Sequence, residues 1–371
     1  MKAVILVGGL GTRLRPLTCN TPKPMLPLVN QPFIEHMIGT LRDQGITEVI
    51  LAVQYLAERF RDTLGDGSRL GVKVQVVEEP EPRGTCGAVK NVEHLLDGTT
   101  FVFNGDVMTD LDLQAMLAFH REHGSKLTIA LTPVEDPTAF GLVETDAATH
   151  RIKSFVEKPK KEEVTTNLIN AGTYILEPEL LRYAPKDEFY MFERGLFPAV
   201  LENGDPMYGF PSNAYWTDIG KPSAYLEVHH DILMGKARYA HRGTQIADGV
   251  WADGEVHISP DAELRGPIVL GAGVRIAAGA TIIGPTVIGA ESTVANGALL
   301  QGALVWDHTE IGANAKIINS TVGRHNTIGA KSIIDDGAVV SDNCSLGAEN
   351  TLARGIRLWP GTSLGDKAVT F

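Results

Sequence analysis

A glycine-rich turn follows the first strand-like run of the chain and is the first feature that could do chemistry. The turn reads Gly8-Gly9-Leu10-Gly11-Thr12-Arg13-Leu14. Backbone N–H groups in such a turn bind anions, although Leu14 replaces the last glycine of a dinucleotide fingerprint. Arg13 and Lys23 add two cations, and the prolines on either side of Lys23 predict an extended segment rather than a helix. The pattern predicts a triphosphate site; the alternative is that Arg13, Arg15 and Lys23 are ordinary surface charges.

Two aspartates are candidate ligands for a divalent cation. Asp106 follows the strand-like run Phe101 to Asn104, and Asp218 lies two residues after Trp216. Hard cations such as Mg²⁺ prefer carboxylate oxygens and keep several waters. Two carboxylates at strand ends, facing one phosphate chain, therefore predict a Mg²⁺ site. Each aspartate taken alone would equally fit a capping or turn position.

Alternating strand-like and helix-like segments must position these residues. The strand-like segments are Lys2 to Val7, Glu48 to Val53, Val72 to Val77 and Thr100 to Phe103, and the helix-like ones are Pro32 to Asp43, Tyr55 to Leu64 and Ala88 to Leu96. Such alternation predicts an α/β fold with a largely parallel sheet covered by helices. Ligands bind beyond the carboxyl ends of the strands in these sheets.

From about residue 251 the pattern changes to an apolar residue at every sixth position. The frame runs through Ile258, Leu264, Leu270, Ile276, Ile282, Ile288, Val294, Leu300 and Trp306 and, after resets at Ile311 and Ile317, through Val322, Ile328, Ile334, Val340, Leu346, Leu352, Leu358 and Leu364. Glycine follows the periodic residue at Gly271, Gly289, Gly312, Gly323, Gly329, Gly347 and Gly365. A hexapeptide period indicates a β-helix with these apolar residues stacked inward, and with Gly or Asn where a corner needs a positive φ. The predicted domains are 1–230, a connector over 231–250 and the coil over 251–371.

The composition of the 371 residues excludes several classes of protein. The net charge of −12 argues against phosphate-backbone binding to nucleic acid, and the three scattered cysteines form neither a disulfide framework nor a zinc motif. No apolar run reaches the length of a transmembrane helix, and the N-terminal run is too short for a signal peptide. We expect a cytoplasmic protein that binds neither nucleic acid nor membrane.

Further motifs follow the glycine-rich turn along the chain. They are Pro22-Lys23-Pro24, Gly84-Thr85-x-Gly87-Ala88, Asn104-Gly105-Asp106, Phe140-Gly141, Val156-Glu157-Lys158-Pro159, Asn170-Ala171-Gly172-x-Tyr174 and Trp216-x-Asp218-Ile219-Gly220. Over about residues 1 to 230 the chain resembles the sugar-1-phosphate nucleotidyltransferases, also called nucleotide-sugar pyrophosphorylases. The resemblance implies a Rossmann-like mixed sheet. The coil resembles the left-handed parallel β-helix of hexapeptide-repeat proteins, which also occurs in this family.

The resemblance implies transfer of a nucleotidyl group from an NTP to a sugar-1-phosphate, with release of pyrophosphate. Its catalytic residues would be Arg13 on the β- and γ-phosphates, Lys23 near the α-phosphate, and Asp106 and Asp218 on Mg²⁺. The nucleotide-binding residues it implies are Gly8, Gly9, Gly11, Thr12, Arg13, Glu79, Gly84 and Thr85. Those implied for the sugar phosphate are Gly141, Glu157, Lys158 and Asn170. Because the nucleophile is already an anion, the reaction needs charge neutralisation and alignment rather than a general base.

The residue at position 79 bears on the choice of base. Glu79 lies in the loop where the family reads the base, and thymidylyl and uridylyl members often carry Gln there. Guanine presents two adjacent donors, N1–H and N2–H₂, which a carboxylate accepts together, whereas an amide suits uracil and thymine. We therefore expect GTP, and with it mannose-1-phosphate as the sugar and GDP-mannose as the product. The alternative is that Glu79 is solvated and the base is held by backbone alone.

Three other interpretations stay open at this point. The first is UTP- or dTTP-dependent transfer to glucose-1-phosphate. The second is a bifunctional uridylyl- and acetyltransferase, for which His308 and His325 are the candidate histidines of the coil. The third is a non-catalytic regulatory paralogue, although this chain keeps the cations and carboxylates that such proteins tend to lose. The coil predicts a homo-oligomer, and we expect a chain cut after residue 250 to keep some turnover because solenoids fold semi-independently.

Overall fold

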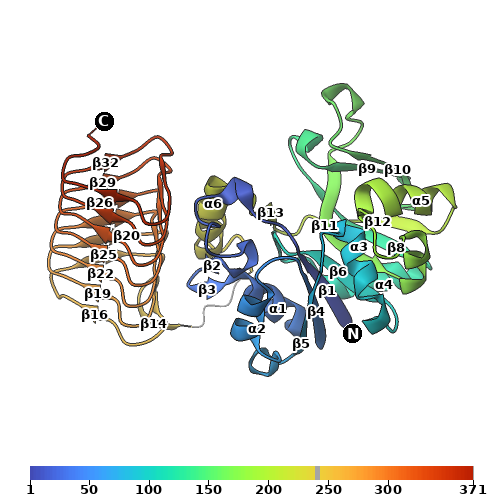
Figure 1. The fold of residues 1–371 in the computed structure, drawn as a ribbon, viewed down its shortest axis with the longest axis horizontal. Helices are drawn as coiled ribbons and strands as arrows, with labels where there is room; N and C mark the ends of the chain where they lie inside the picture. Colours follow the sequence, from blue (N-terminus) through green and yellow to red (C-terminus); the bar gives the residue numbers. More distant parts are fainter. Residues whose placement is uncertain (239–242, 371) are drawn as a thin grey trace. The chain divides into compact units, whose positions relative to one another are not determined.

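The computed structural model describes residues 1–238 and 243–370, and the chain divides into two compact units. The first unit comprises Met1–Leu10 and Ile34–Asp218, and the second comprises Gly11–Phe33 and the chain from Ile219 onward. Figure 1 shows a sheet with helices in the first unit and a stack of short strands in the second. Residues 239–242 of the predicted connector and the last residue of the coil lie outside the described residues. Within the described residues, no helix is long and apolar enough to cross a membrane.

A nine-stranded mixed sheet forms the middle of the first unit (Figure 1). Its strands are β1 (Lys2–Val7), β4 (Glu48–Val53), β5 (Lys73–Glu78), β6 (Thr100–Asn104), β8 (Leu127–Pro133), β9 (Gly141–Thr145), β10 (Ile152–Glu157), β11 (Leu168–Leu176) and β12 (Met207–Pro211). They run in the order β10-β9-β11-β6-β1-β4-β5, with β8 also paired to β11 and β12 paired to β8. A separate ribbon pairs β7 (Val107–Thr109) with β13 (Trp216–Asp218). The predicted α/β fold with a mixed sheet is confirmed.

The parallel strands β6, β1, β4 and β5 bring the ends of several motifs to one edge of this sheet. The run Lys2–Val7 reads as continuous apolar sequence because β1 lies between β4 and β6 and is covered on both faces. Leu6 pairs with Asn104, and Val7 pairs with Val53. The glycine-rich turn after β1 and the aspartate motif after β6 therefore leave the sheet at the same edge.

The helices of the chain are short. They are α1 (Phe33–Asp43), α2 (Ala57–Leu64), α3 (Gly84–Asn91), α4 (Leu113–Glu122), α5 (Phe197–Glu202) and α6 (Pro222–Leu233). Short 3₁₀ turns occupy η1 (Thr12–Leu14), η2 (Lys23–Met25), η3 (Ser68–Leu70), η4 (Glu93–Leu95), η5 (Pro137–Ala139), η6 (Lys161–Glu163) and η7 (Pro178–Tyr183), and a π-helical turn forms η8 (Phe192–Leu196).

The predicted helix Ala88 to Leu96 is wrong at both ends, because α3 begins at Gly84 and ends at Asn91. Its glycines are contact points: a Cβ added at Gly84 would lie 2.8 Å from the carbonyl oxygen of Tyr190, and one added at Gly87 would lie 3.0 Å from that of Glu188. The two glycines that suggest a loop in the sequence instead allow this helix to pack closely on the chain before η8.

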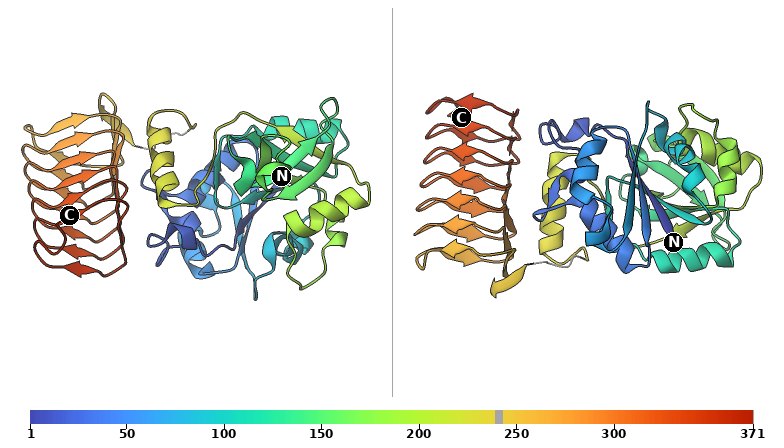
Figure 2. Two further views of the ribbon diagram at one scale, coloured as in Figure 1. Left: turned by 90° about the horizontal axis from the view of Figure 1, so that it is seen from above. Right: turned by 60° about the horizontal axis from the view of Figure 1, so that its bottom comes forward.

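Three sheets of short strands form the β-helix of the second unit. The first sheet holds β14 (Thr244–Ala247), β15 (Val250–Ala252), β18 (Ile268–Leu270), β21 (Thr286–Ile288), β24 (Leu304–Val305), β27 (Thr321–Val322), β30 (Val339–Val340) and β33 (Arg357–Leu358). The second holds β16 (His257–Ile258), β19 (Arg275–Ile276), β22 (Thr293–Val294), β25 (Glu310–Ile311), β28 (Thr327–Ile328), β31 (Ser345–Leu346) and β34 (Ser363–Leu364). The third holds β17 (Glu263–Arg265), β20 (Thr281–Ile283), β23 (Leu299–Gln301), β26 (Lys316–Ile318), β29 (Ile333–Ile334) and β32 (Thr351–Leu352). Pairing is parallel except at β14, Figure 2 shows the strands stacked as rungs, and the predicted coil is confirmed.

The interior of the coil is a continuous apolar column, as the hexapeptide frame predicts, with one correction. Val305 belongs to the buried core of the coil, while Trp306 does not. The step from Leu300 to the next residue of the frame, Val305, is therefore five residues, because this coil is one residue shorter than the preceding ones. Trp306 is turned outward, yet it is only 4% exposed, since its ring packs edge-on against Tyr225 of α6 with centroids 6.2 Å apart.

The prediction that Gly or Asn stands at corners with a positive φ is confirmed at positions such as Gly273, Gly297 and Asn314, but not for the glycines that follow the periodic residues. At one column of corners Glu291, His308, His325 and Asn343 adopt a positive φ as well as the glycines at its two ends. The glycines that follow the periodic residues all lack a positive φ. A Cβ added at Gly271 would lie 2.4 Å from the backbone nitrogen of Ala290, so this glycine lets neighbouring coils approach each other. The rings of His308 and His325 stack at the corner, 4.9 Å apart and 4° from parallel.

The segment Gly11–Phe33 belongs to the same unit as the coil. It contains η1, η2 and a hairpin of β2 (Pro27–Leu28) and β3 (Gln31–Pro32). Lys23 begins the turn η2, so the prediction that it lies in an extended segment is wrong. The physical reason is that a proline at the second position of a helical turn lacks only an N–H that has no partner there, and Pro24 holds that position.

Candidate active site

Asp106 and Asp218 lie next to each other on the β7–β13 ribbon. Asp106 directly precedes β7, and Asp218 pairs with Val107 across the ribbon. The N–H of Gly105 donates to the carbonyl oxygen of Leu6 at 2.9 Å, which holds the link between β6 and β7 against the end of β1. A side chain at position 105 would collide with that oxygen, since an added Cβ would lie 2.5 Å from it. The structure therefore brings the two predicted Mg²⁺ ligands together at the carboxyl edge of the sheet.

This pair of carboxylates suits a magnesium ion. Asp218 faces Val107, the residue directly after Asp106, so the two aspartates occupy neighbouring positions of the ribbon. Within residues 1–238 and 243–370, no group of three or more His, Cys, Asp or Glu side chains could hold a metal ion. Mg²⁺ is commonly bound by one or two carboxylates, with substrate phosphates and water completing its octahedron. The donor set on the ribbon therefore fits this ion.

Gly141, Glu157 and Lys158 form a second group where β9 begins and β10 ends. Gly141 pairs with Glu157, and a Cβ added at Gly141 would lie 3.1 Å from Oε2 of Glu157. The N–H of Lys158 donates to the carbonyl oxygen of Phe140 at 2.9 Å. Lys158 has a φ of +51°, which is rare for a residue other than glycine, and its side chain is exposed. Three residues predicted to bind the sugar phosphate thus lie together.

Asn170 adds a fixed amide beside this group. It follows Ile169, which pairs with Leu142 of β9. Its Nδ2 donates to the hydroxyl of Tyr174 at 2.9 Å, and its Oδ1 accepts the N–H of Gly172 at 2.9 Å. Each bond uses one of two donors or one of two lone pairs of the amide. The remaining donor and lone pair suit the hydroxyl groups of a sugar.

Trp216 connects the β7–β13 ribbon with the residues around Gly141. It lies on β13, two residues before Asp218, and its Nε1 donates to the carbonyl oxygen of Ala171 at 2.9 Å. Its ring meets that of Phe140 edge-on, with centroids 5.4 Å apart. The ribbon is therefore fixed to β11 and to the turn before β9, which places both groups in one region of the first unit.

Glu193 is a candidate site residue that lies in none of the sequence motifs. It lies in the π-helical turn η8 and accepts a hydrogen bond from the hydroxyl of Thr85 at 3.2 Å. Burial raises the pKa of Glu193, and the like charge of Glu157 raises it further. No spacing in the sequence marks this residue. Its only signal is the π-helical turn itself, which is frequent at functional sites and visible only in the structure.

The loop predicted to read the base is ordered by its own carboxylate. Glu79 is buried, which excludes the alternative of a solvated side chain, and its Oε2 accepts the N–H of Arg83 at 3.2 Å. Burial raises the pKa of Glu79. A carboxylate has about four acceptor positions, so this bond leaves capacity for a ligand. The hydroxyl of Thr85 accepts a hydrogen bond from the N–H of Phe192 at 3.0 Å and donates one to Glu193, so it orders η8. Gly84 starts α3 beside it.

The remaining predicted residues lie in and around the glycine-rich turn. Gly8 and Gly9 follow β1 in the first unit, whereas Gly11, Thr12, Arg13 and Lys23 belong to the second. Gly11 has a φ of +59°, and a Cβ added there would lie 3.1 Å from Cγ2 of Thr18 and 3.4 Å from Cβ of Lys23. Arg13 is exposed in η1, and Lys23 is buried. The structure thus places Lys23 directly against the glycine-rich turn.

Comparison with known families assigns most of the chain. A family model described as Nucleotidyl transferase matches residues 2–235, which is more than half of the chain. The chain belongs to the nucleotidyl transferase family. A second model, described as EIF2B subunit epsilon LbH domain, matches residues 247–352 of this nucleotidyl transferase and confirms the left-handed β-helix.

Similar proteins are known for both parts of this nucleotidyl transferase. It is 41% identical to a mannose-1-phosphate guanylyltransferase of Mycobacterium tuberculosis over 74% of this chain and 76% of that protein. It is 32% identical to a UTP–glucose-1-phosphate uridylyltransferase of Synechocystis over 92% of each chain. A crystal structure of HddC from Yersinia pseudotuberculosis complexed with GMP-PN matches with a TM-score of 0.54 and 32% identity, covering 62% of this chain and 99% of that one.

Proposed function

We propose that this nucleotidyl transferase moves the guanylyl group of GTP to mannose-1-phosphate, giving GDP-mannose and pyrophosphate. The main observation in favour of guanine as the base is the buried carboxylate of Glu79 in the loop before α3. Two adjacent N–H donors on guanine match a group that only accepts. The proposal is supported by the mannose-1-phosphate guanylyltransferase named among the relatives and by the complex of HddC with GMP-PN.

In this reaction a phosphate oxygen of the sugar phosphate attacks the α-phosphorus of GTP. The new P–O bond forms as the bond from the α-phosphorus to the bridging oxygen breaks, and pyrophosphate leaves with that electron pair. Arg13 would bind the β- and γ-phosphates and stabilise the charge of the leaving pyrophosphate, and Lys23 would contact the α-phosphate. Lys158 would hold the phosphate of the sugar. Fixed cations of this kind stabilise developing charge and align the reactants.

The other groups in the first unit would bind sugar and metal. Asp106 and Asp218 would hold Mg²⁺, which supplies charge neutralisation on the phosphates when it is bound. Glu157, Asn170 and the backbone at Gly141 would take hydrogen bonds with sugar hydroxyls. Glu157 is an acceptor and Asn170 offers both a donor and an acceptor, so together they suit a polyol with hydroxyls on adjacent carbons.

A substrate matrix tests the proposal. The Synechocystis relative favours a second candidate, transfer of uridylyl from UTP to glucose-1-phosphate. Pyrophosphate release from each of GTP, ATP, UTP and dTTP, with mannose-1-phosphate or glucose-1-phosphate and Mg²⁺, would separate the two. We expect the highest kcat/KM for GTP with mannose-1-phosphate. A higher kcat/KM for UTP or dTTP with glucose-1-phosphate would refute the guanylyl assignment and favour the second candidate.

Lys158→Ala should raise the KM for the sugar phosphate far more than the KM for the NTP. The proposed partner of Lys158 is the sugar-side phosphate alone, and a hydrogen bond to a charged group contributes about 1.5–3 kcal/mol, so an increase of about tenfold to a hundredfold is expected. Steady-state kinetics with each substrate varied in turn measure this. The control is Lys160→Ala, an exposed lysine two residues on. Equal increases in both KM values would show that Lys158 serves the triphosphate instead.

A further inference from the structure

The segment that carries Arg13 and Lys23 is bonded to the coil. Ser341, which follows β30 and is 1% exposed, donates its hydroxyl to the carbonyl oxygen of Pro16 at 3.0 Å. Arg357 of β33 donates from Nη1 to the carbonyl oxygen of Arg15 at 2.9 Å. All four residues belong to the second unit. Two late coils therefore hold adjacent carbonyl groups in the turn that follows η1.

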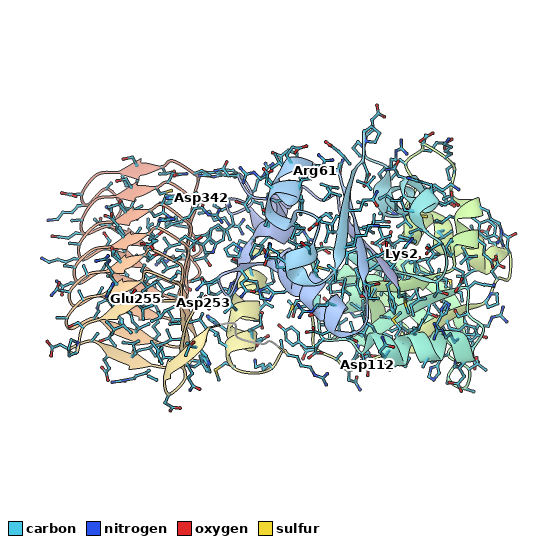
Figure 3. The ribbon with its side chains drawn as sticks, turned by 90° about the horizontal axis from the view of Figure 1, so that it is seen from below. Lys2, Arg61, Asp112, Asp253, Glu255 and Asp342 are labelled. Carbon is cyan, nitrogen blue, oxygen red and sulfur yellow. The ribbon has the colours of Figure 1, made fainter. Side chains whose placement is uncertain are left out.

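A second attachment lies at the other end of the segment. The hairpin of β2 and β3 turns at Val29 and Asn30, both with positive φ, which is the geometry of a type I′ turn. Asn30 donates from Nδ2 to the carbonyl oxygen of Ile288 in β21 at 3.1 Å, and the same atom lies 3.5 Å from Oδ2 of Asp253. In Figure 3, Asp253 and Asp342 lie on the side of the coil that faces this segment. The segment thus spans the first sheet from early to late coils.

Helix α6 completes the attachment. The hydroxyl of Tyr225 donates to the carbonyl oxygen of Pro27, and the same ring packs on Trp306 of the coil. His230 of α6 lies with Nε2 3.1 Å from the carbonyl oxygen of Gly302. Figure 2 shows α6 beside the coil. The outward turn of Trp306, which breaks the hexapeptide frame, therefore supplies part of the surface on which this helix rests.

The attachment reaches the two cations through a short series of contacts. The carbonyl of Arg15 is held by the coil, and its N–H donates to the carbonyl oxygen of Thr12 at 3.2 Å. This bond fixes the C-terminal end of the turn η1, which carries Arg13. The N–H of Cys19 donates to the same Pro16 oxygen that Ser341 holds, at 3.2 Å. Thr18 donates from Oγ1 to the carbonyl oxygen of Gly11 at 2.8 Å.

We propose that the coil positions the triphosphate-binding turn, with Ser341 and Arg357 as positioning residues that act through the carbonyls of Pro16 and Arg15 on Arg13 and Lys23. This inference rests on the proposed roles of Arg13 and Lys23. The hydrogen bonds within this segment join residues close in sequence, so donors from the coil are what fix the segment on the coil. Binding groups must be held within about 0.5 Å to act at full strength. The coil supplies that support, and is more than a scaffold for assembly.

Single substitutions in the full-length enzyme test the proposal. Ser341→Ala and Arg357→Ala should each raise the KM for the NTP about fivefold, which corresponds to about 1 kcal/mol for one hydrogen bond, and leave the KM for the sugar phosphate unchanged. The double variant should reach about twentyfold to thirtyfold. Arg357→Lys keeps a donor and should restore most of the loss. Calorimetric titration with the NTP alone should show the same weakening of Kd.

Matched controls come from the second sheet of the same coil. Ser345→Ala and Arg275→Ala remove an exposed serine and an exposed arginine from β31 and β19, and should leave both KM values unchanged. Folding of every variant is checked by circular dichroism and Tm. A folded Ser341→Ala, Arg357→Ala double variant whose NTP KM stays within twofold of the controls would overturn the proposal. Equal increases in both KM values would also overturn it.

The assays use whichever NTP and sugar phosphate the wild type turns over fastest. A wild type that prefers UTP would refute the guanylyl assignment, and the effect of Ser341 and Arg357 would then be measured with UTP. Failure of the proposed function is therefore seen in the wild type, and failure of the positioning role is seen only in the variants.

Discussion

Asp106→Asn should fold normally and lose about 10²–10³ in kcat at saturating Mg²⁺, because one preorganised electrostatic contact is typically worth that much. The amide has the shape of the carboxylate and lacks its charge, so the β7–β13 ribbon is preserved while one of two anionic oxygen donors is lost. Asp218 faces Val107 on the ribbon, next to Asp106, so Asp218→Asn should lose a similar factor. Titration of turnover with Mg²⁺ should show weaker activation in both variants.

The control for this prediction is Asp112→Asn. Asp112 caps α4 by accepting the N–H of Ala115 at 2.9 Å, and asparagine caps a helix about as well as aspartate. It is close in sequence to Asp106 and should keep full activity. Near-normal turnover of Asp106→Asn at saturating Mg²⁺, with the control also active, would refute the metal assignment.

The coil could be predicted from the sequence to within one residue because its period is local. Each apolar residue of the frame except Trp306 belongs to the interior column of the coil, and the frame needs no knowledge of distant parts of the chain. Trp306 is where this reasoning fails. Its apolar character fits the frame, but the tryptophan is buried outside the coil against Tyr225 of α6, a contact between distant elements that no period encodes.

The candidate site also contains residues that local sequence motifs predict and residues that only the fold brings together. Residues in contiguous motifs, such as Glu157 and Lys158, could be proposed from the sequence, and the structure places them with Gly141 and Asn170. Glu193 stands in no motif and is brought to the site by the turn η8. The bonds from Ser341 and Arg357 join residues more than 300 positions apart. A chain cut after residue 250 would lose both donors, so we expect it to keep some turnover with a raised KM for the NTP.

Glu79→Gln should lower kcat/KM for GTP by about thirtyfold to a hundredfold and leave that for UTP or dTTP unchanged or improved. The amide places a donor against one of the two donors of guanine, and the loss of a charged hydrogen bond with that mismatch costs about 2–3 kcal/mol. The fold should tolerate the change, because the amide oxygen still accepts the N–H of Arg83 that closes the loop. Since burial raises the pKa of Glu79, the preference of the wild type for GTP over UTP should weaken as the pH falls and the carboxylate is protonated.

The measured quantity is the ratio of kcat/KM for GTP to that for UTP, so general damage to the enzyme cancels. Glu78→Gln is the matched control: the neighbouring glutamate is exposed and its carboxylate lies 3.7 Å from Arg61, so this variant should keep the wild-type ratio. An unchanged ratio in Glu79→Gln would mean that this carboxylate only closes the loop through Arg83. The choice of guanine would then rest on similarity to other nucleotidyl transferases alone, and the backbone at the start of α3 would become the candidate for reading the base.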